Sequence, residues 1–335
     1  MSRRPRDKAL SIYDIARDLG ISSGTVSRAF NNHPEVSQVT RERILAKARE
    51  LGYTPSPLAR GLARNVTSAI GIVIPTVYDP FFLDFAQGVQ QAAAEAGVAV
   101  MMTFTDHAEE SLHSAVRSFQ QFRVAGVLLL GGSGLHDVEL RVQFPQLPIV
   151  VALRLSQAST FPAVFVDHRQ GAIAMMRFLA SRKQGPIGYV GLPLVTQAAI
   201  ERLAGYREAI ALLDTPPGLE VVADGNAFAD GITATKRLLQ QARPATIFFA
   251  SDALATGGLN ALAHLGLRVP DDVAVAGFGD IISSSVTVPA LTTVHVPMRE
   301  IGAGAVSLLL QILAGSTQVT PDVELETTLV ARESA

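Results

Sequence analysis

From Ala69 onward, short apolar runs alternate with longer amphipathic segments, and this alternation constrains the fold more than any other feature of the sequence. The first run, Ala69 to Pro75 (AIGIVIP), is continuously apolar, which is typical of a strand covered on both faces. Strands that alternate with helices pair in parallel, because each helix carries the chain back over the sheet before the next strand begins. We therefore expect doubly wound parallel sheets in this part of the chain.

The alternation runs through the chain twice, which predicts two similar α/β lobes. In the first pass we expect strands at 69–75, 98–104, 125–130, 148–153 and 163–166 and helices at 81–96, 109–122 and 137–144. In the second pass we expect helices at 168–182, 200–213, 230–241 and 252–265 and strands at 186–191, 219–223, 246–250 and 272–277. Residues 291–294 and a helix at 298–314 then cross back to the first lobe, where a last strand is expected at 323–330. This assigns 68–167 and 296–330 to an N-lobe and 168–292 to a C-lobe, with a ligand between them at the carboxyl ends of the strands.

The segment before the lobes, Ser11 to Asn31, predicts a helix-turn-helix. Its first helix has one apolar stripe, because Ile12, Ile15, Ala16 and Leu19 recur at helical spacing. Gly20 ends that helix as a left-handed cap, and Ser22 is a suitable N-cap for a second helix at 23–30. Two short helices joined by a Gly-containing turn form a helix-turn-helix, although a small three-helix bundle of any function contains the same unit.

The second helix exposes short polar side chains and one arginine, a surface that fits the major groove of DNA. Val26 and Ala29 face the first helix, whereas the outer side chains are short enough to enter a groove without clashing. Arg28 can contact guanine bidentately or clamp a phosphate, and Thr25 and Ser27 can donate to phosphates. The candidate DNA-binding residues of this region are Ser22, Ser23, Gly24, Thr25, Ser27, Arg28 and Asn31.

Further motifs follow in order. A loop at 31–37 precedes a third helix at 39–51, which Gly52 ends and whose expected apolar face is Ile44, Leu45, Ala48 and Leu51. Taken together, YDIARDLGISSGTVSRAFN, VS..TRERI, LGY.P and LAR.LA resemble the headpiece of the LacI family of bacterial transcription regulators. We therefore assign residues 1–56 to a DNA-binding headpiece and residues 57–67 to a hinge helix or linker.

The resemblance implies a role for the hinge. In the LacI family this segment becomes helical on operator DNA, and the paired hinge helices of a dimer enter the minor groove. Leu62 stands at the position of the family's inserted leucine, which opens a base step and kinks the duplex, and Arg60 lies beside it. Gly61 lowers helix propensity by roughly 1 kcal/mol relative to Ala, which suits a segment that orders only when bound. An ordinary linker leucine is the alternative for Leu62.

The body of the chain also resembles the LacI family, whose effector domain is similar to periplasmic sugar-binding proteins. The motifs that carry this resemblance are IGIVIP, DPFF, RLAGY, SDALATGGLNAL, GLRVPDDVAVAGF and PALTTV. It implies that Phe81 and Phe82 lie where family members stack aromatic rings on the effector, with core packing as the alternative for one of the pair. Arg202 matches the effector-anchoring arginine, whose fork can clasp hydroxyls or a carboxylate, unless it is a surface arginine.

Three acidic residues after strands complete the candidate effector site. Asp252 follows the strand TIFFA and Asp167 follows the strand AVFV, so each can either contact the effector or cap the next helix. Where many family members have Gly-Phe-Asp-Asp, this chain has Gly277-Phe278-Gly279-Asp280, so the usual hydroxyl acceptor is Gly279. Asp280 is a candidate replacement. Because a carboxylate is lost and Arg202 is kept, we expect a sugar acid such as gluconate, or another small carboxylate, as the effector.

Charge is divided unevenly along the chain. The net charge is -2, but residues 1–65 carry 12 Lys and Arg against 6 Asp and Glu, whereas the rest carries 16 against 24. A basic head on an acidic body directs the head to phosphates, and Arg3, Arg4, Arg6 and Lys8 form either a mobile arm or a solvated tail.

Other function classes lack their signatures. The sequence has no cysteine, no metal-ligand spacing around its 7 His, no complete phosphate loop at Gly131 to Gly134, and no nucleophile elbow, so we expect no metal, no cofactor and no enzyme activity. The basic start lacks an apolar run, and no stretch reaches membrane-span length, so a soluble, cytoplasmic protein is expected.

The expected function is a sequence-specific transcription regulator, most simply a repressor. It would bind a pseudo-palindromic operator in double-stranded DNA as a homodimer, because one headpiece reads only half a palindrome. A small sugar or sugar-acid effector would control it. The alternative is a sugar-binding protein with a non-functional DNA-binding head.

Overall fold

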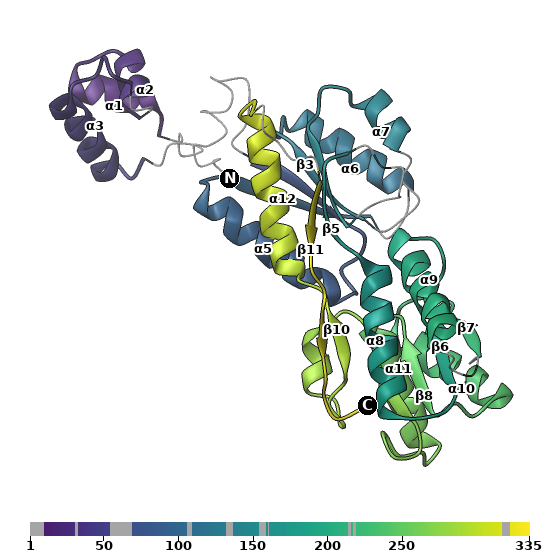
Figure 1. Ribbon diagram of the computed structural model, residues 1–335. Helices are drawn as coiled ribbons and strands as arrows, with labels where there is room; N and C mark the ends of the chain where they lie inside the picture. Colours follow the sequence, from purple (N-terminus) through teal and green to yellow (C-terminus); the bar gives the residue numbers. More distant parts are fainter. Residues whose placement is uncertain are drawn as a thin grey trace, which may run out of the picture. The chain divides into compact units, whose positions relative to one another are not determined.

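The computed structural model describes residues 10–30, 33–53, 69–105, 109–131, 137–153, 159, 161–213, 216, 219–316 and 322–335 (Figure 1). The chain divides into two compact units, residues 1–67 and residues 68–335. The predicted hinge at 57–67 lies outside the described residues, as do Asn31, Arg60, Leu62 and the basic residues at the start. None of the helices that the structure describes combines the length and apolar character that a bilayer crossing requires.

The first unit contains the predicted helix-turn-helix and a third helix. Its helices are α1 (Ile12–Leu19), α2 (Ser23–Phe30) and α3 (Gln38–Glu50). Their small core consists of Ile15, Ala16, Val26, Ala29, Val36, Ile44 and Ala48. Leu45 was expected on the apolar face of α3 but is 36% exposed. It lies one position beyond Ile44, which already fills the contact with α1 and α2, so the apolar stripe is narrower than predicted.

Local hydrogen bonds explain where these helices begin and end. Asp14 accepts from the backbone N–H and the hydroxyl of Ser11 at 3.0 and 2.8 Å, which fixes the start of α1. Gly20 has φ +65°, a left-handed conformation that glycine adopts without strain, and it closes α1 by bonding to the carbonyl of Arg17. Ser37 caps α3 by accepting from Thr40 N–H.

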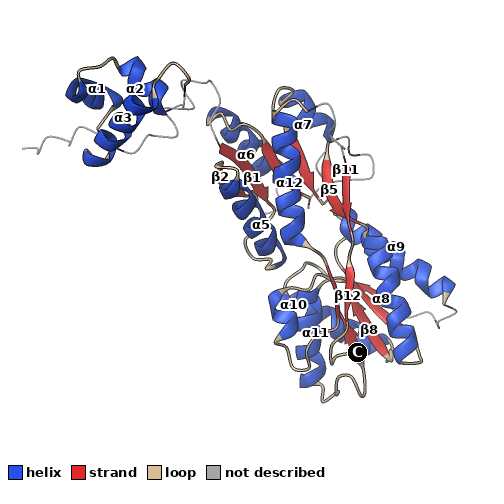
Figure 2. Cartoon of the chain, turned by 60° about the vertical axis from the view of Figure 1, so that its left-hand side comes forward, coloured by secondary structure: helices blue, strands red, loops and turns tan. Residues whose placement is uncertain are grey.

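The N-lobe is built on a six-stranded sheet in which every pair of neighbours is parallel. The strand order is β11-β5-β4-β3-β1-β2. The sheet strands are β1 (Ala69–Ile74), β2 (Ala99–Phe104), β3 (Val127–Leu130), β4 (Ile149–Ala152), β5 (Ala163–Val166) and β11 (Asp322–Leu325). Helices α5 (Phe81–Glu95) and α12 (Met298–Leu313) cover one face, and α6 (Glu109–Gln121) and α7 (Asp137–Gln143) cover the other (Figure 2).

The C-lobe repeats this architecture with four parallel strands in the order β7-β6-β8-β9. Its strands are β6 (Ile187–Gly191), β7 (Glu220–Val222), β8 (Thr246–Phe249) and β9 (Ala274–Ala276). Helices α8 (His168–Arg182) and α9 (Gln197–Leu212) pack on one face, and α10 (Phe228–Gln241) and α11 (Asp252–His264) pack on the other. The predicted fold class, a helix-turn-helix headpiece followed by two doubly wound lobes, is confirmed.

The chain passes between the lobes three times, and the third passage corrects one prediction. The first two passages lie between β5 and α8 and between β10 (Thr293–His295) and α12. The single strand expected at 323–330 is two strands, because β11 pairs with β5 in the N-lobe whereas β12 (Thr328–Val330) pairs with β10 in a separate antiparallel sheet. Glu326 and Thr327 span the gap. The last residues then reach β9, where Ser334 is fully buried and its carbonyl accepts from Val275 N–H.

Other differences from the prediction are local. Helix α9 begins at Gln197 rather than at 200, because Thr196 caps it by accepting from Ala199 N–H. Helix α10 begins at Phe228 rather than at 230, because Asp230 folds back to accept from Ala227 N–H. A short 3-10 helix, η1 (Ile282–Ser285), was not predicted.

Glycines of α12 allow a test of the helix packing in the N-lobe. A Cβ atom on Gly302 would lie 2.4 Å from the backbone oxygen of Phe85 in α5, whereas one on Gly304 would lie 3.4 Å from Val164 Cγ1. We expect Gly302→Ala to lower the free energy of unfolding by roughly 1–3 kcal/mol, because the two helices must separate. Gly304→Ala is the matched control and should be neutral or stabilising by up to about 1 kcal/mol. Urea unfolding of both variants measures the difference, and equal stabilities would contradict close packing at Gly302.

Candidate functional site

Helix α2 presents the predicted polar surface at its N-terminal half. Ser22 caps the helix by accepting from Thr25 N–H at 3.1 Å, and the two hydroxyls lie 2.9 Å apart. Gly24 is exposed, and a Cβ atom there would lie within 3.7 Å of both Ser22 Oγ and Arg28 Nη2. Ser23, Thr25 and Ser27 are half-buried, so their hydroxyls are less prominent than the sequence suggested. The structure thus brings Ser22, Gly24, Thr25 and Arg28 together on one surface.

Arg28 is the one long cationic side chain of this surface. Its Nη1 lies 2.8 Å from Glu35 Oε2, and its Nε donates to Gly24 O at 3.3 Å. Both partners of the ion pair are at least half exposed, at 50% and 63%. Such a solvated pair contributes only about 0–1 kcal/mol, so the guanidinium can exchange Glu35 for another anion at little cost.

Tyr13 and Glu35 of the headpiece were not among the residues predicted from the sequence. Tyr13 lies on α1 outside its apolar stripe and is 69% exposed, so its ring is available for contact. The sequence could have indicated Tyr13, because an aromatic residue stands there on the otherwise polar side of a short helix. The pairing of Glu35 with Arg28 crosses the loop after α2 and has no signature in the local sequence.

In the body, Arg202 of α9 is a buried cation. It is 4% exposed, its Nη1 donates to Ala250 O at 2.6 Å, and its Cζ lies 4.1 Å from the centroid of the Phe278 ring. Its Nε is buried and has no hydrogen-bond partner. Burial lowers the pKa of Arg202 to about 10, so the group is still charged at pH 7. Its burial disproves a surface location. No carboxylate of the described residues forms an ion pair with it, although the charges of Asp252, Asp79 and Glu201 favour its protonated form.

His168, which was not predicted from the sequence, also lies against Arg202. Its Nδ1 lies 3.3 Å from Arg202 Nη2, and its ring lies 5.7 Å from that of Phe278. Burial, and then the charge of Arg202, hold the pKa of His168 well below its usual value. The imidazole is therefore neutral at pH 7, and its Nδ1 accepts from the guanidinium.

Asp252 does not cap its helix, which corrects one of its two expected roles. Ser251 is the N-cap of α11 and accepts from Leu254 N–H at 3.2 Å. Asp252 is 1% exposed. Its carboxylate accepts from Ile281 N–H at 3.0 Å, from Ser284 Oγ at 2.9 Å and from Thr293 Oγ1 at 2.5 Å. The carboxylate thereby ties α11 to η1 and to β10.

Asp280 is also engaged by the protein itself. Its Oδ1 lies 2.7 Å from Arg332 Nη2, and its Oδ2 lies 3.1 Å from His295 Nδ1. It borders a pocket of about 300 Å³ that Phe81, His295 and Arg299 also line. Gly279, the departure from the family pattern, has φ +134°, which disfavours any residue with a Cβ. A Cβ there would lie 3.3 Å from Phe81.

The remaining predicted residues lie around the carboxyl ends of the N-lobe strands. Phe81 and Phe82 begin α5, are half-buried, and have ring centroids 5.7 Å apart. Both pack against the N-lobe core, and Phe81 also lines the pocket at Asp280. Asp167 caps α8 by accepting from Gln170 N–H at 2.9 Å, and it borders a second pocket of about 300 Å³ with His168 and Glu201.

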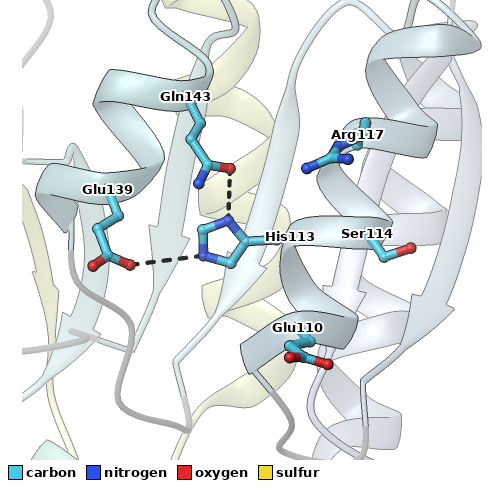
Figure 3. A pocket seen from close by; sticks show the side chains of 6 residues that line it. All are labelled: Glu110, His113, Ser114, Arg117, Glu139 and Gln143. Atoms are coloured by element: carbon cyan, nitrogen blue, oxygen red, sulfur yellow. Dashed lines mark hydrogen bonds and ion pairs between the residues drawn. The ribbon is translucent and has the colours of Figure 1, made fainter.

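A larger pocket of about 450 Å³ lies elsewhere, between α6 and α7 on the outer side of the N-lobe (Figure 3). His113 Nδ1 lies 2.7 Å from Gln143 Oε1, and its Nε2 lies 4.0 Å from Glu139. The described residues contain no cluster of His and carboxylates suited to a metal.

Comparisons with known proteins match both units. The family described as bacterial regulatory proteins, lacI family, matches residues 11–56, and a periplasmic binding protein-like domain matches residues 176–335. The transcriptional repressor CytR of Escherichia coli is 31% identical over 94% of this chain and 93% of its own length. The ribose operon repressor of Escherichia coli is 32% identical over 97% of this chain and 99% of its own. The crystal structure of a lac repressor dimer bound to operator and an anti-inducer has a TM-score of 0.89 at 26% identity, covering 98% of this chain and 99% of that one.

Asp252 provides a test of the buried carboxylate. We expect Asp252→Ala to lower the free energy of unfolding by roughly 3 kcal/mol, because three buried donors lose their acceptor. Burial raises the pKa of Asp252, so the native state should lose stability as the pH rises from the unfolded pKa through the native one.

A variant without the charge separates the loss of the hydrogen-bond acceptor from the pH dependence of stability. Asp252→Asn keeps the size of the side chain and should lose the pH-dependent decline. Asp84→Ala, at a 52% exposed aspartate, should change stability by less than about 1 kcal/mol. Chemical unfolding at several pH values measures all three variants, and an Asp252→Ala variant as stable as Asp84→Ala would contradict the anchoring role.

Proposed function

Because this chain belongs to the LacI family of bacterial transcription regulators, we propose that it is a repressor whose dimer binds a pseudo-palindromic operator and is controlled by a small anionic effector. CytR and the ribose operon repressor of Escherichia coli, which cover nearly all of its length, are named as repressors. The observation that carries the DNA-binding role is the surface of α2, where short polar groups surround Arg28, which is held by a solvated ion pair with Glu35 and a hydrogen bond to Gly24 O. A regulator of chromosomal genes acts in the cytoplasm.

The DNA contacts follow from the chemistry of α2. Arg28 would exchange Glu35 for guanine or phosphate, and Ser22 and Thr25 would donate to phosphates at the helix N-terminus. The exposed Tyr13 of α1 is a further candidate for backbone contact. By family resemblance, the hinge would add Leu62 as a minor-groove wedge with Arg60 beside it.

Exposed apolar residues on the body support dimerisation. Ile282, Val286 and Val288, in and after η1, are 81%, 75% and 95% exposed. Met102 and Phe104 of the edge strand β2 are each 43% exposed. Large apolar side chains gathered at a surface mark interfaces in soluble proteins. Two headpieces would then read the two halves of the operator.

The buried cation supports a carboxylate effector. Arg202 has an unpartnered Nε, and no ion pair with the described residues compensates its charge. An anion bound at the cleft would supply the missing acceptor and an ion-pair partner for the guanidinium. Gly279 supports the same conclusion, because the acidic side chain that would repel an anion is lost and the backbone conformation disfavours its return.

The alternative function is a sugar-binding protein with a non-functional head. The paired Arg28 and Glu35 are the feature that would support it, if the ion pair blocked DNA binding. The DNA-fragment selection and the salt titration described next decide between the two functions.

The DNA-binding role predicts a specific outcome in a genomic-fragment selection with the purified protein. A pseudo-palindromic sequence should be enriched, and Arg28→Ala should weaken binding to it by about tenfold or more. Leu62→Ala should also weaken it. Arg17→Ala, at a 75% exposed arginine of α1, is the matched control and should have a smaller effect.

Salt titration of the best fragment completes this test. A steep salt dependence without any enriched sequence would indicate backbone binding alone. If neither Arg28→Ala nor Leu62→Ala changes binding, the regulator function fails and the alternative is favoured.

The effector class predicts a pattern in thermal unfolding. D-Gluconate and other sugar acids should raise the melting temperature, with about 2.7 kcal/mol of stabilisation at a hundredfold excess over Kd. Glucose and ribose should have smaller effects. Arg202→Met should abolish the stabilisation, whereas Arg207→Met, at a 62% exposed arginine of the same helix, should retain it. Stabilisation by neutral sugars alone would overturn the anionic effector.

A further inference from the structure

Two polar residues join the lobes directly. Asp79 lies between β1 and α5 in the N-lobe, and Asn226 lies between β7 and α10 in the C-lobe. Asn226 Nδ2 donates to Asp79 Oδ2 at 2.8 Å. The bond uses protein atoms only, so it needs no bound molecule to connect the lobes.

The bond belongs to a continuous hydrogen-bonded chain. On the N-lobe side, Asp79 Oδ1 accepts from Phe81 N–H at 3.0 Å, at the first turn of α5. On the C-lobe side, Asn226 Oδ1 accepts from Ser251 Oγ, whose oxygen also accepts from Leu254 N–H at the first turn of α11. The N-termini of one helix in each lobe are therefore linked through three side chains. Every polar atom of the Asn226 amide group has a partner in this chain.

Electrostatic attraction also favours a carboxylate at position 79, the N-lobe end of these hydrogen bonds. Asp79 is among the carboxylates whose charge stabilises the protonated form of the buried Arg202 in the C-lobe. The same carboxylate that accepts from Asn226 therefore also attracts the C-lobe cation, although it does not form an ion pair with it. Both effects weaken when the lobes separate.

We propose that Asp79 and Asn226 form an interlobe latch that holds the two lobes together, and that the operator affinity of the protein depends on this bond. The second part rests on the proposed function. An effector that separates Asp79 from Asn226 must replace Asp79 as the acceptor for Asn226 and as one of the anions that attract Arg202. A carboxylate does both, which narrows the effector to molecules that carry one beside hydroxyl groups.

The latch can be tested by exchanging its two side chains. Asn226→Asp places two carboxylates against each other and should break the bond. The double variant Asp79→Asn with Asn226→Asp should restore it, because Asn at 79 can donate to Asp at 226 while still accepting from Phe81 N–H. Asn260→Asp makes the same change at an exposed residue of α11 and is the matched control.

Pulsed electron paramagnetic resonance reads the distance between the lobes. The sequence has no cysteine, so spin labels can be placed at two introduced cysteines, Glu95→Cys in α5 and Lys236→Cys in α10. In Asn226→Asp the short-distance population should fall by about fivefold or more relative to the longer one. The double variant and Asn260→Asp should match the parent. An unchanged distribution in a folded Asn226→Asp variant would overturn the latch, as would failure of the double variant to restore the distance.

Operator binding tests the regulatory part separately. With the enriched fragment as the probe, Asn226→Asp should change Kd by about fivefold or more and the double variant should restore it. Altered distances with an unaltered Kd would overturn the coupling to DNA. If the selection enriches no sequence, the proposed function fails, whereas the distance measurement still decides whether the latch exists.

Discussion

The requirement that parallel strands be separated by a return of the chain determines most of this structure. Apart from β5, which follows β4 without an intervening helix among the described residues, a strand of the two sheets pairs with its neighbour only after a helix has carried the chain back across one face. The carboxyl ends of all the strands therefore gather at one edge of each lobe. The loops that begin there carry Asp79, Asp167, Asn226, Ser251 and Gly279. A cleft lined with polar groups between two lobes is thus a direct outcome of the sheet topology.

The elements that local patterns define were predictable. Continuous apolar runs such as Ile70 to Ile74 identified the central strands, because both faces of a doubly wound sheet are buried. The helix-turn-helix was predictable because Gly20 and Ser22 are the residues that its turn needs. Helix starts were less certain where a cap lies outside the apolar repeat, as Thr196 and Asp230 do. Fold class, and the residues of α2, therefore followed from spacing and caps alone.

The partners of polar side chains were not predictable, because residues far apart in the sequence supply them. Asp252 satisfied the local pattern of a helix cap, yet its carboxylate accepts hydrogen bonds from Ile281, Ser284 and Thr293. Asp280 follows a strand as a ligand-binding aspartate would, yet it pairs with Arg332. The split of the last strand into β11 and β12 was unpredictable for the same reason. The two strands pair with partners in different sheets, β5 and β10, and the chain leaves one sheet for the other at residues 326 and 327. Arg202 was identified by its motif, but its burial against Phe278 depends on the tertiary fold.

The interleaving of the lobes has a consequence for biosynthesis. Helix α12 and strand β11 complete the N-lobe, but the ribosome makes them only after the entire C-lobe sheet. During translation, the apolar side of α5 that faces α12 therefore remains uncovered while β6 to β9 are produced. Neither lobe is encoded by one uninterrupted stretch, so the nascent chain cannot fold one lobe fully before starting the other. Such long-range closure slows folding and prolongs the time in which chaperones can bind the exposed surface.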